Sequence, residues 1–165
     1  SARIPLGLLQ ANPGHLPALE QLASVVSDAG DAERLAPVVA RLRIDAPSAA
    51  ATRYYSATLA YLQQRPEVAI REAEAALAAD PSHARAQNIL GAALAGVGQR
   101  DRARAAFTAA LASDPRDPAT YSNLAALELE SGNTSAAHRY YAEALTIDPS
   151  NAVARDGLAT VLALR

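Results

Sequence analysis

Histidine is the residue type in this chain best suited to acid–base or metal chemistry, and there are three histidines: His15, His83 and His138. His15 and His83 stand at the same position of a repeating pattern, two repeats apart. That separation is about 20 Å if each helix layer adds roughly 8–10 Å. The two therefore cannot share a metal ion, and we expect both in turns. His138 has no second ligand at metal-binding spacing and is expected to be structural.

Other catalytic arrangements are missing from the sequence. The chain has no cysteine, which excludes disulfides, thiol catalysis and cysteine-ligated metals. Glu72 and Glu74 are two residues apart and would not share a helix face, so they do not make a carboxylate pair. Neither a glycine-rich phosphate loop nor a Gly-x-Ser-x-Gly turn occurs. We expect no catalytic residue, no cofactor and no metal, and hence no enzyme.

Charge gives no general drive towards nucleic acid, because the formal net charge is −2. All 15 basic residues are arginine, which GC-rich codon usage explains better than selection for bidentate anion binding. Arg100, Arg102 and Arg104 are interrupted by Asp101 and are expected at a solvated helix start. No apolar run approaches the ~20 residues that would span a bilayer, so we expect no direct membrane insertion.

Prolines recur every 34 residues, at Pro13, Pro47, Pro81, Pro115 and Pro149. Other positions keep the same period. Glycine stands 17 residues before three of these prolines, with Gln64 in the slot before Pro81. Small residues stand 24 residues before four of them, at Ala23, Ala57, Gly91 and Ala125. The Ala-Leu pairs 76–77, 110–111 and 144–145 also keep step. A fixed period of this length predicts a repeat array in which each unit packs on its neighbours.

These residues resemble the tetratricopeptide repeat family, and specifically a fragment of a bacterial member. The stretch from Tyr121 to Pro149 matches the family pattern best, and the stretch from Ala84 to Pro115 nearly as well. The resemblance covers essentially the whole chain. It implies an all-α fold, a right-handed α-solenoid of tandem helix-turn-helix repeats. The implied single domain, 1–165, divides into the end of a preceding repeat at 1–15, repeats at 16–49, 50–83, 84–117 and 118–151, and a C-terminal helix at 152–165.

Local signals place the helices. Asp80, Asp114 and Asp148 precede prolines, which end helices, and Ser82, Asp117 and Ser150 are expected N-caps. Pro37 lies inside an expected helix and should kink it or delay its start. Leu22, Leu90, Phe107, Leu124 and Tyr141 are expected in the core. Helices are expected near 16–29, 32–45, 49–64, 66–79, 83–97, 100–113, 118–131, 134–147 and 151–164, with a short one before Pro13.

The resemblance also implies that the first helix of each repeat lines a concave groove that binds a partner. The proline phase assigns one face of each first helix to that groove. Tyr54 and Tyr61 supply amphipathic contact area, or alternatively fill the space between successive helices. The predicted groove residues are Glu20, Ser24, Ser27, Tyr54, Thr58, Tyr61, Arg85, Asn88, Ala92, Ala95, Ser122, Ala126 and Leu129. The family's carboxylate clamp and asparagine ladder are both incomplete, although Asn123 would be one rung.

The sequence thus predicts a scaffold that binds a peptide or helical segment of a partner protein. Two alternatives stay open: a structural arm of a bacterial envelope or exopolysaccharide-secretion assembly, and the regulatory arm of an enzyme whose catalytic domain lies elsewhere. The compartment, cytoplasmic or periplasmic, is not indicated. The final helix carries Val153, Leu158, Val161, Leu162 and Leu164, which is too apolar for a capping face. We therefore expect this helix to be covered by further repeats or to self-associate.

Overall fold

The computed structural model describes residues 16–164, and within that range the regular structure is entirely helical. The expected short helix before Pro13, and His15, lie outside the described residues. The observed bounds differ from the expected ones by two residues at most. The helices are α2 (Leu16–Asp28), α3 (Ala32–Asp45), α4 (Ala50–Leu62), α5 (Pro66–Ala79), α6 (Ala84–Gly96), α7 (Arg100–Ser113), α8 (Pro118–Glu130), α9 (Thr134–Ile147) and α10 (Ala152–Ala163).

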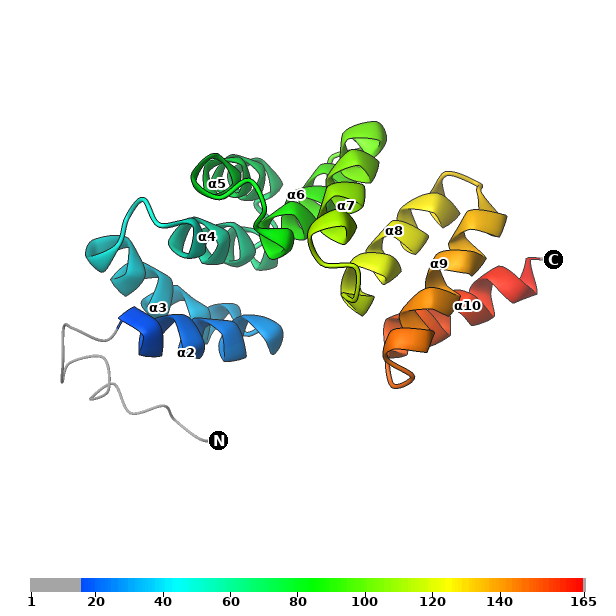
Figure 1. The fold of residues 1–165 in the computed structure, drawn as a ribbon, viewed down its shortest axis with the longest axis horizontal. Coiled ribbons are helices and arrows are strands. Elements are labelled where there is room, and N and C mark those ends of the chain that lie inside the picture. Colours follow the sequence, from blue (N-terminus) through cyan, green and yellow to red (C-terminus); the bar gives the residue numbers. More distant parts are fainter. Residues whose placement is uncertain (1–15, 165) are drawn as a thin grey trace. The chain divides into compact units, whose positions relative to one another are not determined.

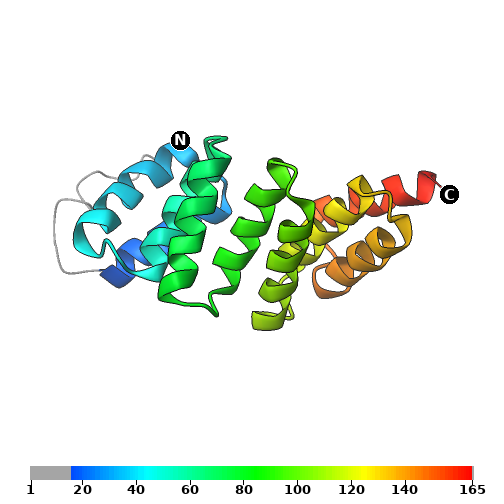
Figure 2. The same ribbon diagram turned by 90° about the horizontal axis from the view of Figure 1, so that it is seen from above.

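The chain divides into two compact units, with the boundary between Pro81 and Ser82. In unit 1, α2 packs on α3 and α4 packs on α5, while α3 and α4 join the two pairs. In unit 2, α6 packs on α7, α8 packs on α9, and α10 adds to α8 and α9 (Figure 1). Figure 2 shows α8, α9 and α10, in yellow, orange and red, side by side. Each unit is therefore built from helix pairs. The single-domain organisation with the repeat limits given above stays a prediction.

The turns between paired helices need a left-handed residue, and three are glycines. Gly30, Gly98 and Gly132 have φ of 66°, 77° and 80°. Gln64 holds the same position after α4 with φ 57°, although it has a side chain. The repeat geometry therefore imposes the turn even where glycine is missing, at a cost of about 1–2 kcal/mol.

Helix starts follow the expected chemistry with two corrections. Asp117 caps α8 and accepts hydrogen bonds from the amides of Ala119 and Thr120. The caps of α6 and α10 are His83 and Asn151 rather than the preceding serines. His83 Nδ1 accepts from the Ala86 amide at 3.1 Å. Asn151 Oδ1 accepts from the Ala154 amide at 2.9 Å. Each helix thus starts one residue later than the serines predicted.

Pro37 lies inside α3. Of the two expected effects, a kink or a late start of the helix, the late start does not occur. The helix begins at Ala32, where Asp31 caps it by accepting from the Arg34 amide at 3.0 Å. Pro37 itself is exposed. The carbonyl that loses its partner on that side can therefore be hydrated, which lowers the cost of the proline.

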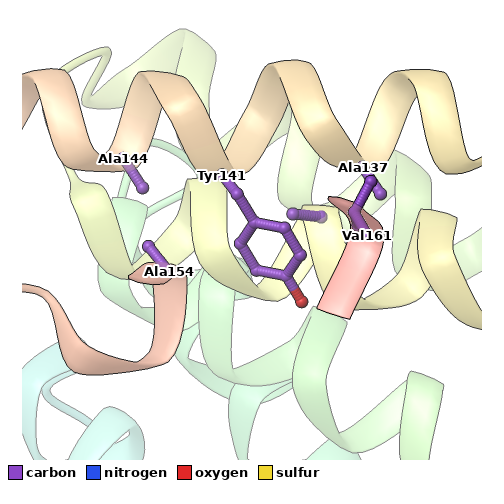
Figure 3. Close-up of a cluster of buried hydrophobic side chains, with 6 residues drawn as sticks. Ala137, Tyr141, Ala144, Ala154 and Val161 are labelled. Carbon is purple, nitrogen blue, oxygen red and sulfur yellow. The ribbon is translucent and has the colours of Figure 1, made fainter. Parts of the chain in front are cut away.

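In the core of unit 2, two aromatic rings pack directly against glycines of a neighbouring helix. Phe107 of α7 lies against Gly91 of α6, where an added Cβ would come within 2.6 Å of the ring. Tyr141 of α9 lies against Gly157 of α10, where an added Cβ would overlap its ring. Figure 3 shows the Tyr141 ring among small residues of α9 and α10. Burial, and secondarily the negative charge of Glu130, raises the pKa of the Tyr141 phenol.

The predicted core is confirmed at Phe107, Leu124 and Tyr141, which are buried, whereas Leu22 and Leu90 are only half-buried. Val161, expected among the uncovered residues of the last helix, is instead fully buried against the cluster around Tyr141 (Figure 3). It lies on the side of α10 that packs on α9, so it belongs to the core.

A buried carboxylate connects three helices of unit 1. Glu72 of α5 is buried, and its two carboxylate oxygens accept from Arg43 of α3 at 2.9 Å and from Arg53 of α4 at 3.0 Å. Arg43 also donates to the Ser56 hydroxyl at 3.1 Å. One side chain therefore ties three successive helices together.

Candidate partner-binding surface

The predicted surface of unit 1 lies on α2 and α4, and its tyrosines are not equally accessible. Tyr54 is 7% exposed, and its ring centroid lies 4.8 Å from that of Tyr55. Thr58 is also buried and donates its hydroxyl to the Tyr54 carbonyl. Tyr61 is 42% exposed. Tyr54 thus has the packing role that the alternative interpretation described, while Tyr61 offers an accessible ring.

The α2 side of this surface is polar. Glu20, Ser24 and Ser27 are half-buried. The Ser24 hydroxyl donates to Asp28 at 3.5 Å. The Glu20 carbonyl accepts from the Tyr55 hydroxyl at 3.1 Å, which joins α4 to α2. This contact between α4 and α2 uses the backbone carbonyl of Glu20 and not its carboxylate.

The predicted surface of unit 2 lies on α6 and α8 and centres on an amide pair. Asn123 Nδ2 donates to Asn88 Oδ1 at 3.0 Å across the two helices. Ala92, Ala95, Ala126 and Leu129 are half-buried, and Arg85 is exposed. Ser122 is only 2% exposed, and its hydroxyl donates to the Pro118 carbonyl, so it presents no polar group to a ligand. On α8, therefore, the accessible polar side chain is that of Asn123 and not that of the predicted Ser122.

The Asn123 pairing follows a spacing that the 34-residue period does not show. Asn88 and Asn123 are 35 residues apart, and so are Glu20 and Tyr55. Both bonds join successive first helices one residue out of register with the repeat. The positions equivalent to Asn123 in the two preceding repeats hold Ile89 and Tyr55, so a comparison of equivalent positions finds no partner for Asn123. The signal therefore lies in diagonal pairs rather than in equivalent ones.

The arginine cluster at the start of α7 is only partly solvated. Arg100 and Arg102 are exposed. Arg104 donates to Glu128 of α8 at 2.6 Å and to Asp101 at 3.1 Å, and the hydrogen bond with Glu128 is the largest cause that raises the Arg104 pKa. Glu128 also accepts from Asn133 at 3.0 Å. Arg104 therefore links repeats and is not available to a ligand.

Metal-binding clusters and membrane spans are both missing from residues 16–164. No group of three or more histidine, cysteine, aspartate or glutamate side chains in that part of the chain could hold a metal ion. His138 of α9 is half-buried. No helix among the same residues is long and apolar enough to span a bilayer.

Comparison with solved structures places the fold among helical repeat proteins. PilF of Pseudomonas aeruginosa is 21% identical with a TM-score of 0.75, over 90% of this chain and 68% of that one. A thermophilic tetratricopeptide repeat protein of Thermus thermophilus is 24% identical with a TM-score of 0.77, over 96% of this chain and 85% of that one. The first such domain of Spaghetti (RPAP3), bound to the HSP90 peptide SRMEEVD, is 18% identical with a TM-score of 0.67, over 70% and 94% of the two chains.

Comparison by sequence gives the family. No curated protein matches the sequence. The family model described as tetratricopeptide repeat matches residues 56–96 and 93–152, which together make up more than half of the chain. The turn glycines, the small residues of the first helices and the rings of Phe107 and Tyr141 lie where the sequence pattern predicted them. The chain therefore belongs to the tetratricopeptide repeat family, and its fold is an all-α helical repeat solenoid.

Proposed function

We propose that this protein is a non-catalytic scaffold that binds an extended peptide segment of a partner protein along α6 and α8. Tetratricopeptide repeats commonly mediate protein–protein interaction, and one structural neighbour is a domain bound to a peptide. The observation that carries the proposal for this chain is the hydrogen bond between Asn88 and Asn123.

Two carboxamides that are hydrogen-bonded to each other can still form hydrogen bonds with a ligand. Each carboxamide has an NH2 group that donates and an oxygen that accepts. One bond between them uses the NH2 of one and the oxygen of the other, which leaves an oxygen on Asn123 and an NH2 on Asn88. A free oxygen and a free NH2 remain whichever way round the two amides are assigned. The pair therefore presents one acceptor and one donor together, the complement of a peptide group.

An extended segment suits this pair better than a helical one. Backbone N–H and C=O groups are internally paired in a helix and are available for outside partners only in an extended chain. Around the pair, Ala92 and Ala126 have short side chains that leave room for a ligand backbone, and Leu129 adds apolar area. Arg85, exposed on α6, can attract an acidic group of the segment.

In unit 1, the exposed ring of Tyr61 is the group that we propose for a separate contact with a partner, independent of the surface on α6 and α8. Truncating a tyrosine at the centre of a contact costs about 1–2 kcal/mol, so Tyr61→Ala should weaken a partner that binds unit 1 by about that amount. Tyr54→Ala should instead mainly reduce stability, because Tyr54 is buried against Tyr55.

The test is selection of binders from a displayed peptide library, followed by fluorescence anisotropy with one selected peptide. Asn123→Ala removes the unpaired acceptor and should weaken binding by about 1 kcal/mol, roughly fivefold. The matched control is Thr146→Ala, on the exposed side of α9, where the hydroxyl bonds only its own helix. It should leave the affinity unchanged.

Thermal unfolding of each variant separates binding from folding. A loss of affinity in Asn123→Ala at an unchanged melting temperature supports the proposal. Equal affinities in Asn123→Ala, Asn88→Ala and the wild type would contradict it, because they would place the peptide away from the amide pair.

A further inference from the structure

We propose that the start of α4, in unit 1, binds a carboxylate group of another molecule. The site consists of the backbone amides of Ala51 and Thr52 and the side-chain hydroxyl of Thr52. It is separate from the surface of α6 and α8 and does not depend on the function proposed above. The inference rests on a buried hydroxyl without a partner and on an equivalent site at α8 that a carboxylate fills.

The hydroxyl of Thr52 is buried and has nothing to bond. Thr52 is 0% exposed, and its Oγ1 has no hydrogen-bond partner among the described residues. The other two hydroxyls of serine and threonine on α4 are satisfied, since Ser56 donates to the Thr52 carbonyl and Thr58 to the Tyr54 carbonyl. A buried hydroxyl without a partner is costly and uncommon in native proteins. The position of Thr52 in the first turn of α4 therefore calls for a ligand that supplies the partner.

The start of α8 shows which group fits this position. Thr120 stands two repeats after Thr52, and each is the third residue of its helix. The carboxylate of Asp117 accepts from the amides of Ala119 and Thr120 at 3.1 Å and 3.2 Å and also from the hydroxyl of Thr120. One carboxylate thus satisfies two amides and one hydroxyl, and α4 has the same three donors.

The two helix starts also share their backbone geometry. Ala49 and Asp117 hold the cap positions with extended backbones, at φ −63° and ψ 138° and at φ −87° and ψ 104°. Each carbonyl accepts the first helical bond, from the amide of Arg53 at 3.1 Å and from that of Tyr121 at 3.4 Å. The first amides of a helix have no partner within the helix, and no side chain caps α4. The donors of α4 are therefore arranged as at α8, with no acceptor of their own.

Charge and access both favour an anion at this start. The amino end of a helix carries the positive end of its dipole. Arg53 stands in the first turn of α4 and shares Glu72 with Arg43 of α3, which leaves one positive charge in excess. Asp45, the acidic residue nearest in sequence, is paired with Arg41 at 2.7 Å.

A carboxylate can approach from the loop between α3 and α4. Pro47 and Ser48 are exposed, and residues 49–51 are half-buried. The methyl side chain of Ala49 leaves room where the longer side chain of Asp117 lies at α8. Because all three groups of the site are donors, an ionised carboxylate, which only accepts, suits them better than a carboxamide.

NMR of the 15N-labelled chain tests the site in a titration in which acetate replaces chloride at constant ionic strength. The amide signals of Ala51 and Thr52 should shift along a saturating curve. The signals of Ala119 and Thr120 should stay fixed, because Asp117 already fills the site at α8. Thr52→Val removes the hydroxyl with little change of shape and should raise the dissociation constant of acetate about fivefold.

A second probe distinguishes the source of the carboxylate. Aspartate with both backbone ends blocked presents the same group on a peptide unit. Tighter binding of this probe than of acetate would support a side chain of a partner protein as the ligand, and weaker binding would support a small acid.

A matched pair of variants exchanges the two helix starts. Ala49→Asp supplies α4 with its own carboxylate and should abolish the response of the two α4 amides to acetate. Asp117→Ala removes the carboxylate from α8 and should make the two α8 amides respond. Thermal unfolding without acetate shows whether each variant is folded. Amides of Ala51 and Thr52 that do not respond in the wild type, or that respond equally in folded Ala49→Asp, would overturn the proposal.

Discussion

The two units hold their helices together by different chemistry at equivalent positions. In unit 2 the key side chains are aromatic: Phe107 fits against Gly91 and Tyr141 against Gly157. In unit 1 the same slot of the repeat holds Val39 and Ala73. Neither side chain reaches as far as a ring. The buried carboxylate of Glu72, paired with two arginines, makes the connection between helices there.

This difference shows that the repeat fixes backbone geometry without fixing how the geometry is stabilised. A ring against glycine contributes through buried apolar area and close packing. A buried ion pair contributes only while both partners are present, because a lone buried charge is costly. We therefore expect unit 1 to respond mainly to the removal of charges, and unit 2 to respond to changes of side-chain volume as well as to loss of the pair between Arg104 and Glu128.

The largest effect should follow from Phe107→Ala. Loss of a fully buried ring should cost about 3–5 kcal/mol of stability. Hydrogen exchange of backbone amides should show the loss in α6 and α7. Thr108→Ala, one residue further on and exposed, is the control and should have little effect. Protection of α6 and α7 that is unchanged by Phe107→Ala would disprove the role of the ring.

In unit 1 the expected effect depends on which partner is removed. Arg43→Met together with Arg53→Met leaves Glu72 buried without a cation and should cost about 3 kcal/mol. Glu72→Gln should cost less, about 1–2 kcal/mol, because the two arginine side chains are 50% and 36% exposed and regain water. Denaturant unfolding measures both. A larger cost for Glu72→Gln than for the arginine pair would contradict this account.

The glycine positions give the next largest effect. Gly91→Ala and Gly157→Ala each place a Cβ into an aromatic ring. Overpacking of this kind costs about 1–3 kcal/mol, against a gain of up to ~1 kcal/mol in helix propensity. Gly96→Ala is a matched control, because nothing lies within 4 Å of its added Cβ. It should stabilise the chain slightly. Melting temperatures that rise equally in all three would show that the rings do not need the glycines.

Sequence analysis predicted the helices well because proline, glycine and alanine mark the repeat at fixed intervals. It could not predict which of the individual groove residues are buried by neighbouring side chains. The 34-residue phase places Tyr54, Tyr61 and Ser122 on the first helices but does not show which neighbour packs over each. In the structure Tyr54 and Ser122 are buried, whereas Tyr61 is exposed. The sequence analysis named Asn123 only as a single rung of an asparagine ladder and did not pair it with Asn88, because the two are 35 residues apart, not 34.

The smallest effect concerns two equivalent helix starts. At α8, Asp117 accepts from the backbone and from the hydroxyl of Thr120. At α4, Ala49 stands in the cap position without a side-chain bond, and the buried hydroxyl of Thr52 has no partner. Asp117→Ala should cost about 1 kcal/mol, and Ala49→Asp should gain a similar amount by capping α4 and accepting from Thr52. Thermal unfolding checks both, and destabilisation by Ala49→Asp would show that the α4 start cannot adopt the α8 geometry.

The most direct test of the binding proposal observes the two carboxamides themselves. The side-chain NH2 signals of Asn88 and Asn123 can be followed by NMR in the 15N-labelled chain during titration with a selected peptide. The account predicts that both signals shift with the peptide concentration, together with backbone amides of α6 and α8. Signals of Asn88 and Asn123 that stay fixed while shifts gather on the exposed sides of α7 and α9 would contradict it.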